Sequence, residues 1–175
     1  MTTVKNSYPE LNEIDYKKTT VDMRNVIAYI KSLNVLKAVK LAAYTMFRME
    51  SGNGQSGINH NYMGIQADSG RWPDFLTQHA VGTVVKKENM SAKERRFLAF
   101  DSFESSVDFL IDRIQKRGLY VGGTSNFIVK QYIDTPATWT EVYWKTWVTG
   151  NLNAKIPLRE KGELVQMYNL GSALF

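Results

Sequence analysis

The chain has 175 residues, of which 43% are hydrophobic and 22% charged, and this balance excludes an intrinsically disordered chain. The net charge of +5 favours an anionic partner such as nucleic acid, a bacterial cell wall or an acidic membrane surface. With no cysteine and only two histidines, disulfides, thiol catalysis and cysteine-ligated zinc are excluded. We therefore expect neither a metal nor another cofactor.

Recognition signals for two of these partners are missing from the sequence. There is no helix-turn-helix, zinc-finger or RNA-binding signature, so we expect no nucleic-acid partner. No run approaches about 18 apolar residues, so we expect no membrane insertion. Residues 1–19 lack the apolar core of a signal peptide, so we expect any export to use another route.

Two helices are expected near the start of the chain. Hydrophobic residues recur every three or four positions from Thr20 to Leu33, which predicts the first helix. Asn34 is a suitable cap for a second helix that ends near Met49 and uses Leu36 on its apolar side. The middle of this helix is small and apolar, which indicates burial on more than one face.

A loop and a hairpin are expected next. Glycine and asparagine are frequent from Ser51 to Gly70, as in loops with left-handed backbone. Residues 83–87 and 95–100 alternate as strands do, and residues 89–92 between them suit a turn.

The remainder of the chain is expected to be helical. Ser102 is a good cap for a helix that ends at Gly118, and a shorter helix is expected over residues 126–133. A further helix starts at Thr135-Pro136 or at Thr138, where Thr138-x-x-Glu141 has capping-box form.

A last helix covers residues 160–170, which completes an α+β, mainly α, plan with one small hairpin. We expect an arm over residues 1–19 and a single domain over residues 20–175.

Glu50 is the residue most suited to catalysis. It is expected at the C-terminal end of an apolar helix, immediately before Ser51-Gly52. Partial burial and the negative end of the helix dipole both disfavour a charged carboxylate there, which predicts a raised pKa. A protonated glutamic acid is what cleavage of a glycosidic bond requires, because the leaving oxygen must receive a proton.

The sequence around Glu50 carries two ordered motifs. ESGNGQS starts at Glu50, NYMGIQ starts at Asn61, and Trp72 follows. The order and spacing resemble the glucosaminidase family of peptidoglycan hydrolases, which includes autolysins and flagellar muramidase-like domains of the lysozyme superfamily. That family has Glu-Ser/Thr-Gly-x-Gly-x-Ser, then Asn-Leu-Phe-Gly-Ile/Val-Lys, then tryptophan. This chain departs from the pattern at Asn53, at Tyr62-Met63 and at Gln66.

The resemblance extends over residues 35–121 and implies both a fold and an activity. The implied fold is a lysozyme-like helical domain with a small hairpin beside the catalytic cleft. The implied activity is cleavage of the β-1,4 glycan of peptidoglycan, as an endo-N-acetylglucosaminidase or a muramidase, with Glu50 as general acid. The family places a second acid on the hairpin, for which Glu88 is the first choice and Glu94 the second. Assistance from the substrate's N-acetyl group would make that second acid dispensable.

Further residues are expected to contact substrate. Tyr62 and Trp72 suit stacking on sugar rings, and Tyr120 suits a place along the cleft. Ser56 and Asn61 are expected either at the substrate or as hydrogen-bonding partners of the loop that positions Glu50.

Three alternative functions stay open at this point. Lytic transglycosylases share the single helix-terminal glutamate, and a catalytically silent lysozyme-like module would bind glycan or a protein. A basic nucleic-acid-binding domain would leave the Glu50 motif unexplained. For the enzyme, we expect action on the cell wall, in the periplasm or outside the cell. Delivery would be by a holin, a phage particle or a secretion apparatus, or by a signal since removed, and an export or immunity partner would fit.

Overall fold

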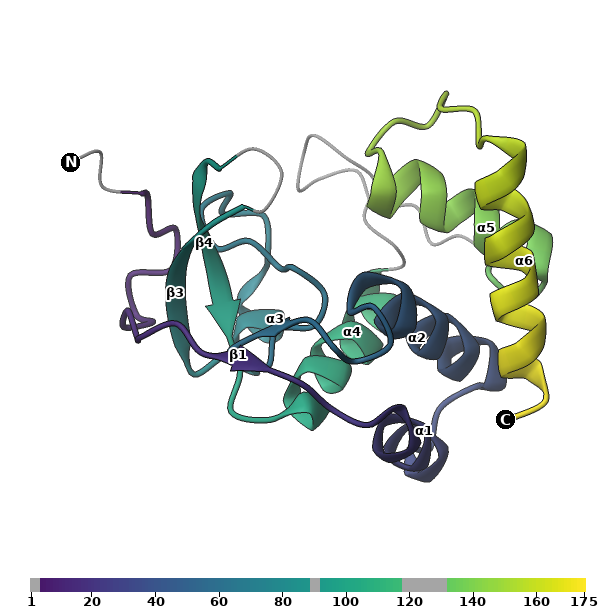
Figure 1. Cartoon of the computed structure of the whole chain (residues 1–175), viewed down its shortest axis with the longest axis horizontal. Helices are drawn as coiled ribbons and strands as arrows, with labels where there is room; N and C mark the ends of the chain where they lie inside the picture. The colour runs from purple at the N-terminus through teal and green to yellow at the C-terminus, as the bar shows by residue number, and fades with distance from the viewer. Residues whose placement is uncertain (1–3, 89–91, 118–131) are drawn as a thin grey trace. The chain divides into compact units, whose positions relative to one another are not determined.

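A computed structural model describes residues 4–88, 92–117 and 132–175 (Figure 1). The fold is α+β and mainly α, as expected, with helices and two two-stranded antiparallel sheets. The chain forms two compact units, one of residues 1–26 and 47–109 and the other of residues 27–46 and 110–175. The first unit holds the four strands that the structure describes and the candidate site.

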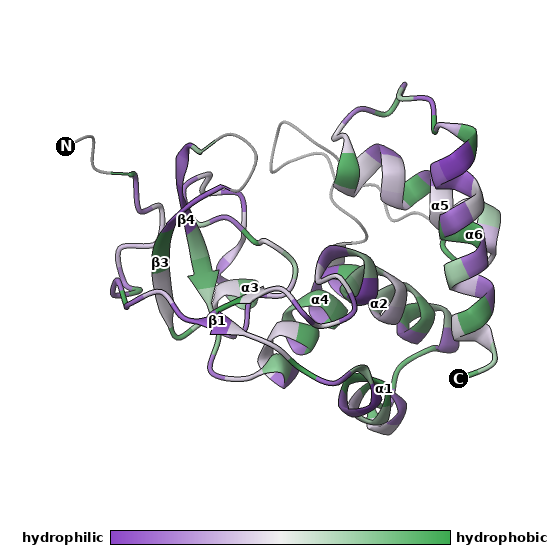
Figure 2. Cartoon of the chain, viewed as in Figure 1, coloured by the Kyte–Doolittle hydropathy of each residue, from purple (hydrophilic) through white to green (hydrophobic). Residues whose placement is uncertain are grey.

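The predicted hairpin is confirmed in the first unit. Strand β3 (Gly82–Lys87) pairs with β4 (Glu94–Ala99), with Gly82 opposite Ala99 and Lys87 opposite Glu94. The second half of β4 is hydrophobic in Figure 2, and its residues Phe97, Leu98 and Ala99 are buried. A short helix, α3 (Asp74–Thr77), precedes the hairpin.

The segment before the first helix is fixed to this unit by backbone pairing. Ile14 donates to the Thr83 carbonyl and Thr83 donates to the Asn12 carbonyl, each at 2.8 Å, so the segment runs beside β3 (Figure 1). Strand β1 (Lys18–Thr19) then pairs with β2 (Gly57–Ile58). Residues 12–19, expected to form an arm, thus follow the edge of the hairpin and reach the loop after Glu50.

Helices α1 (Met23–Ser32), α2 (Lys37–Glu50) and α4 (Phe103–Arg117) each contribute residues to both units. Helix α2 is buried on more than one face, as predicted, since residues 41–47 are all buried. It begins at Lys37 rather than next to Asn34, and the Leu36 carbonyl accepts its first backbone hydrogen bonds. Leu36 is exposed because it precedes the helix, so its expected place on the apolar side was wrong. Ser102 caps α4 through the Ser105 backbone, as predicted.

The second unit contains α5 (Pro136–Val142), the π-helical turn η1 (Tyr143–Val148) and α6 (Leu158–Ser172). Of the two predicted starts of this helix, Thr135-Pro136 is confirmed, and the capping box from Thr138 to Glu141 was wrong. Thr135 is the N-cap of α5, and Pro136 takes the first helical position. The Thr135 side chain accepts from the Thr138 backbone N–H, and the Thr138 side chain accepts from the Thr135 backbone N–H. The final helix is confirmed. Residues 126–131 of the expected short helix lie outside the described residues, and residues 132–133 are not helical.

Candidate functional site

Glu50 is the last residue of α2, and the chain turns sharply after it. The Ser51 hydroxyl donates to the Phe47 carbonyl at 2.5 Å and accepts from the Gly54 backbone at 2.8 Å. Gly52, Asn53 and Gly54 have φ values of 56°, 59° and 78°. Three consecutive left-handed residues explain why this segment consists of glycine and asparagine.

The turn is joined to the N-terminal segment. The Val21 backbone N–H donates to the Gly54 carbonyl at 2.8 Å, and the Lys17 carbonyl accepts from the Asn59 backbone at 2.8 Å. The Thr19 hydroxyl accepts from the His60 backbone at 2.9 Å. These hydrogen bonds flank the β1–β2 pair and fasten the loop from Ser51 to His60 to the N-terminal segment.

Glu50 lines a cavity of about 330 Å³, a volume within the range that small-molecule sites occupy. Four of the residues singled out in the sequence line it together: Glu50, Ser56, Asn61 and Tyr62. Tyr16 and Lys18 from the N-terminal segment, Ile58 from β2 and Lys86 from β3 complete its side-chain wall. The structure therefore brings the two sequence motifs to one place.

Asn61 holds the loop in position. Its side-chain amide donates to the carbonyls of Ile65 and Leu98, at 2.9 and 2.8 Å, and its oxygen accepts from the Ile65 backbone at 3.0 Å. Both donors are used, so Asn61 fixes the second motif against β4. Ser56 lines the cavity and is exposed, and its backbone N–H donates to the Ser51 carbonyl.

Tyr62 forms the wall of the cavity and does not present an open ring. It is 1% exposed, and its ring lies 4.9 Å from that of Phe47. Burial raises the pKa of its phenol, although the nearby Thr19 hydroxyl opposes that change. Within the described part of the chain, no residue is placed to form a hydrogen bond with the buried Tyr62 hydroxyl. Sugar stacking on Tyr62 would require this ring to become accessible.

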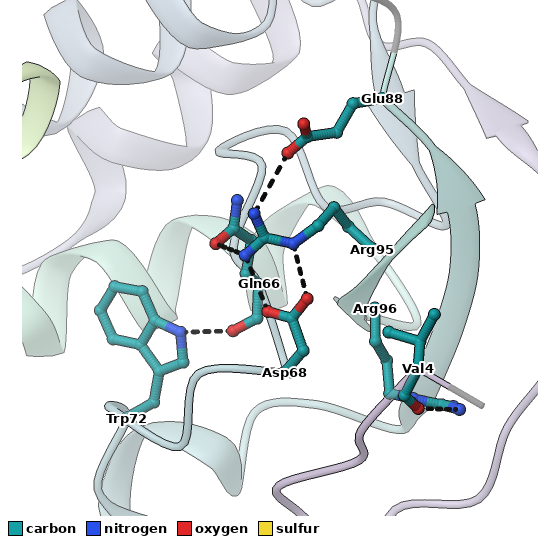
Figure 3. A network of polar contacts seen from close by, with 7 residues as sticks. All are labelled: Val4, Gln66, Asp68, Trp72, Glu88, Arg95 and Arg96. Atoms are coloured by element: carbon teal, nitrogen blue, oxygen red, sulfur yellow. Dashed lines mark hydrogen bonds and ion pairs between the residues drawn. The ribbon is translucent and has the colours of Figure 1, made fainter. Parts of the chain in front are cut away.

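Trp72 lies in the core, away from the cavity lining. It is 4% exposed, its ring makes an edge contact with Phe109 at 5.3 Å, and its indole N–H donates to the Gln66 carbonyl at 2.8 Å (Figure 3). Its backbone N–H donates to the Tyr8 hydroxyl at 2.7 Å. In this arrangement Trp72 supports the loop that carries the second motif. Tyr120 lies outside the described residues.

Glu88 belongs to a polar network around Arg95 (Figure 3). Its carboxylate lies 3.5 Å from the Arg95 guanidinium, which also pairs with Asp68 at 2.6 Å and donates to the Gln66 side chain at 2.5 Å. Glu94 lines a separate cavity of about 680 Å³ beside Asp68 and Arg95. Among the described residues, Glu50 is thus the only carboxylate that lines the smaller cavity.

We expect Glu88→Gln to change the rate of wall lysis by less than about threefold, because Glu88 pairs with Arg95 and does not line the cavity that Glu50 lines. Lysis and thermal unfolding would be measured together, with Glu94→Gln as the control on the opposite strand. A fall in kcat of tenfold or more at an unchanged melting temperature would instead support the hairpin acid that the family resemblance implies.

Asp68 is the anionic centre of the Arg95 network. Burial acts to raise its pKa, but the hydrogen bond and charge of Arg95, with backbone N–H groups, outweigh burial and hold the pKa below its ordinary 3.8. The side chains of Asp68 and Arg95 are 12% and 23% exposed, so solvent screens the pair only in part.

Asp68→Asn should destabilise the protein by about 1–3 kcal/mol at neutral pH, because a charged hydrogen bond is lost. The folded-state pKa is depressed, so this stability is present above the ordinary pKa and is lost as pH falls through the folded value. Urea unfolding from pH 7 to pH 3 would show the two proteins converging at acid pH. Glu141→Gln is the control, since its pair with Lys145 is exposed. A difference that does not vary with pH would contradict this role for the Asp68 charge.

Sequence reasoning missed Tyr16, Lys18 and Lys86. Lys86 was detectable, because alternation along β3 puts it on the same face as buried Val84. Tyr16 and Lys18 gave no local signal, since they reach the cavity through pairing with residues about 40 positions later.

Residues 4–88, 92–117 and 132–175 contain no group of three or more histidine, aspartate or glutamate side chains placed to hold a metal ion. None of the helices described is long and apolar enough to cross a membrane. No protein-family model, curated protein or solved structure matches the chain.

Proposed function

We propose that this protein cleaves the β-1,4 glycan backbone of peptidoglycan, with Glu50 as general acid in a lysozyme-like site. One observation carries the proposal: the helix-terminal Glu50 shares a cavity with Ser56 of its own motif and with Asn61 and Tyr62 of the second. The proposed place of action is the bacterial cell wall, and the net charge of +5 suits an anionic wall.

Two features of the site support Glu50 as the acid. Glu50 is partly buried at a helix end, where its carboxyl can deliver a proton to a leaving oxygen that enters the cavity. The side-chain bonds of Asn61 and Ser51 fix the two loops around it, so the acid is held in place before substrate arrives.

A second candidate is a lytic transglycosylase. Glycosidases that use two carboxylates, whether they invert or retain the anomeric configuration, hold them about 5–10 Å apart on either side of the glycosidic bond. The described lining of the cavity supplies one carboxylate. This favours a reaction in which the substrate provides the second group, either its N-acetyl oxygen followed by water or its own hydroxyl.

Digestion of purified sacculi, followed by mass analysis of the released glycans, tests the proposal. A reducing N-acetylglucosamine end indicates a glucosaminidase, a reducing muramic acid end a muramidase, and an anhydro-muramic end a transglycosylase. The absence of any glycan product would overturn the proposal. Binding to sacculi without products would indicate the silent module.

A further inference from the structure

The wall of the Glu50 cavity carries more positive than negative charge. Lys18 and Lys86 both line it, and Glu50 is the one acidic residue among the described lining. Lys86 is half-buried, and its ammonium lies 5.8 Å from the centre of the Tyr16 ring, which favours a cation at this position. The net charge of these three side chains is positive whether Glu50 is ionised or protonated.

This imbalance discriminates between ligands. A neutral glycan in the cavity offers the ammonium groups hydroxyl and amide oxygens as acceptors, but it brings no charge to balance them. A ligand carboxylate restores charge-assisted hydrogen bonds to them. The cavity is therefore better matched to an acidic sugar unit than to a neutral one.

Building on the proposed function, we propose that Lys18 and Lys86 select glycans that carry a carboxylate next to the bond to be cleaved. Peptidoglycan offers this chemistry from two sources. One is the lactyl carboxylate of a muramic acid unit without peptide, and the other is the first free carboxylate of an attached peptide. A polymer of N-acetylglucosamine offers neither.

Calorimetric binding to the Glu50→Gln variant tests this, because that variant prevents turnover. The probes are a disaccharide-repeat tetrasaccharide with free lactyl carboxylates, its lactyl methylamide, its L-alanyl-D-glutamate derivative and tetra-N-acetylchitotetraose. We expect at least one carboxylate-bearing probe to bind about tenfold or more tightly than the neutral probes, as charge-assisted contacts imply. The preference should weaken as salt rises.

Lysine variants connect the preference to the cavity. Lys18→Met and Lys86→Met should each reduce it at least about fivefold. Lys17→Met and Lys87→Met are the matched controls, because these exposed neighbours do not line the cavity. In the active chain, the same two cavity variants should raise KM, as the loss of a binding contact implies.

The outcomes separate this inference from the proposed function. Equal binding of all four probes overturns the inference whether or not sacculi are digested, as does a preference that survives both cavity variants. Preference for the free acid over its methylamide identifies the lactyl carboxylate, whereas preference for the peptide derivative alone identifies the peptide carboxylate. If binding prefers carboxylate-bearing probes through the two lysines but the chain releases no glycan, the inference is supported and the proposed enzymatic function is overturned.

Discussion

We expect Glu50→Gln to reduce lysis of cell walls by about 10²- to 10⁴-fold while the protein stays folded, because general acid catalysis contributes a factor of this size. The carboxamide has nearly the same size as the carboxyl but has no transferable proton. Release of dye from labelled sacculi would give the rates, and circular dichroism with thermal unfolding would verify the fold. Glu10→Gln is the matched control, since Glu10 is an exposed carboxylate in the same unit.

The pH profile gives an independent reading of the same residue. In the unmodified chain, the alkaline limb of kcat/KM reports ionisation of the acid in the free enzyme. Residual activity of Glu50→Gln should lack that limb. Activity of a folded Glu50→Gln within a few-fold of the unmodified chain would remove Glu50 from the mechanism and the proposed function with it.

Local sequence signals predicted the elements that depend on neighbouring residues. The hairpin, the multi-faced burial of α2, the Ser102 cap and the left-handed loop after Glu50 each follow from residues close in sequence. The start of α5 was less determinate, because Thr135 and Thr138 both have capping side chains. Proline at position 136 decides between them by occupying the first helical position.

Parts of the site depend on contacts that no local signal announces. Lys18 reaches the cavity because β1 pairs with β2, and Glu88 pairs with Arg95 of β4 and is not among the residues that line the cavity. Tryptophan is a residue type that often stacks on sugars, but Trp72 is buried and packs on Phe109. Aromatic residue type therefore does not distinguish a sugar platform from a core residue.

The structure joins the loop after Glu50 to the N-terminal segment so closely that one methyl group should disrupt the site. A Cβ atom at Gly54 would lie 2.2 Å from the Val21 carbonyl oxygen, and the backbone there has φ +78°. At Gly52 φ is +56°, and a Cβ atom would have no atom within 4 Å. The two glycines thus share the left-handed backbone and differ in the space around them.

We therefore expect Gly54→Ala to destabilise the protein by roughly 2–5 kcal/mol, the sum of a left-handed backbone penalty and steric overlap. Gly52→Ala should cost only the backbone part, about 1–2 kcal/mol. To relieve the overlap, Val21 must move, and the β1 residues that bring Lys18 to the cavity move with it. Gly54→Ala should then lose lysis below its unfolding temperature, whereas Gly52→Ala should keep most of it. Urea unfolding and lysis assays on both variants test this, and equal destabilisation by the two would show that the contact between Gly54 and Val21 does not hold the site together.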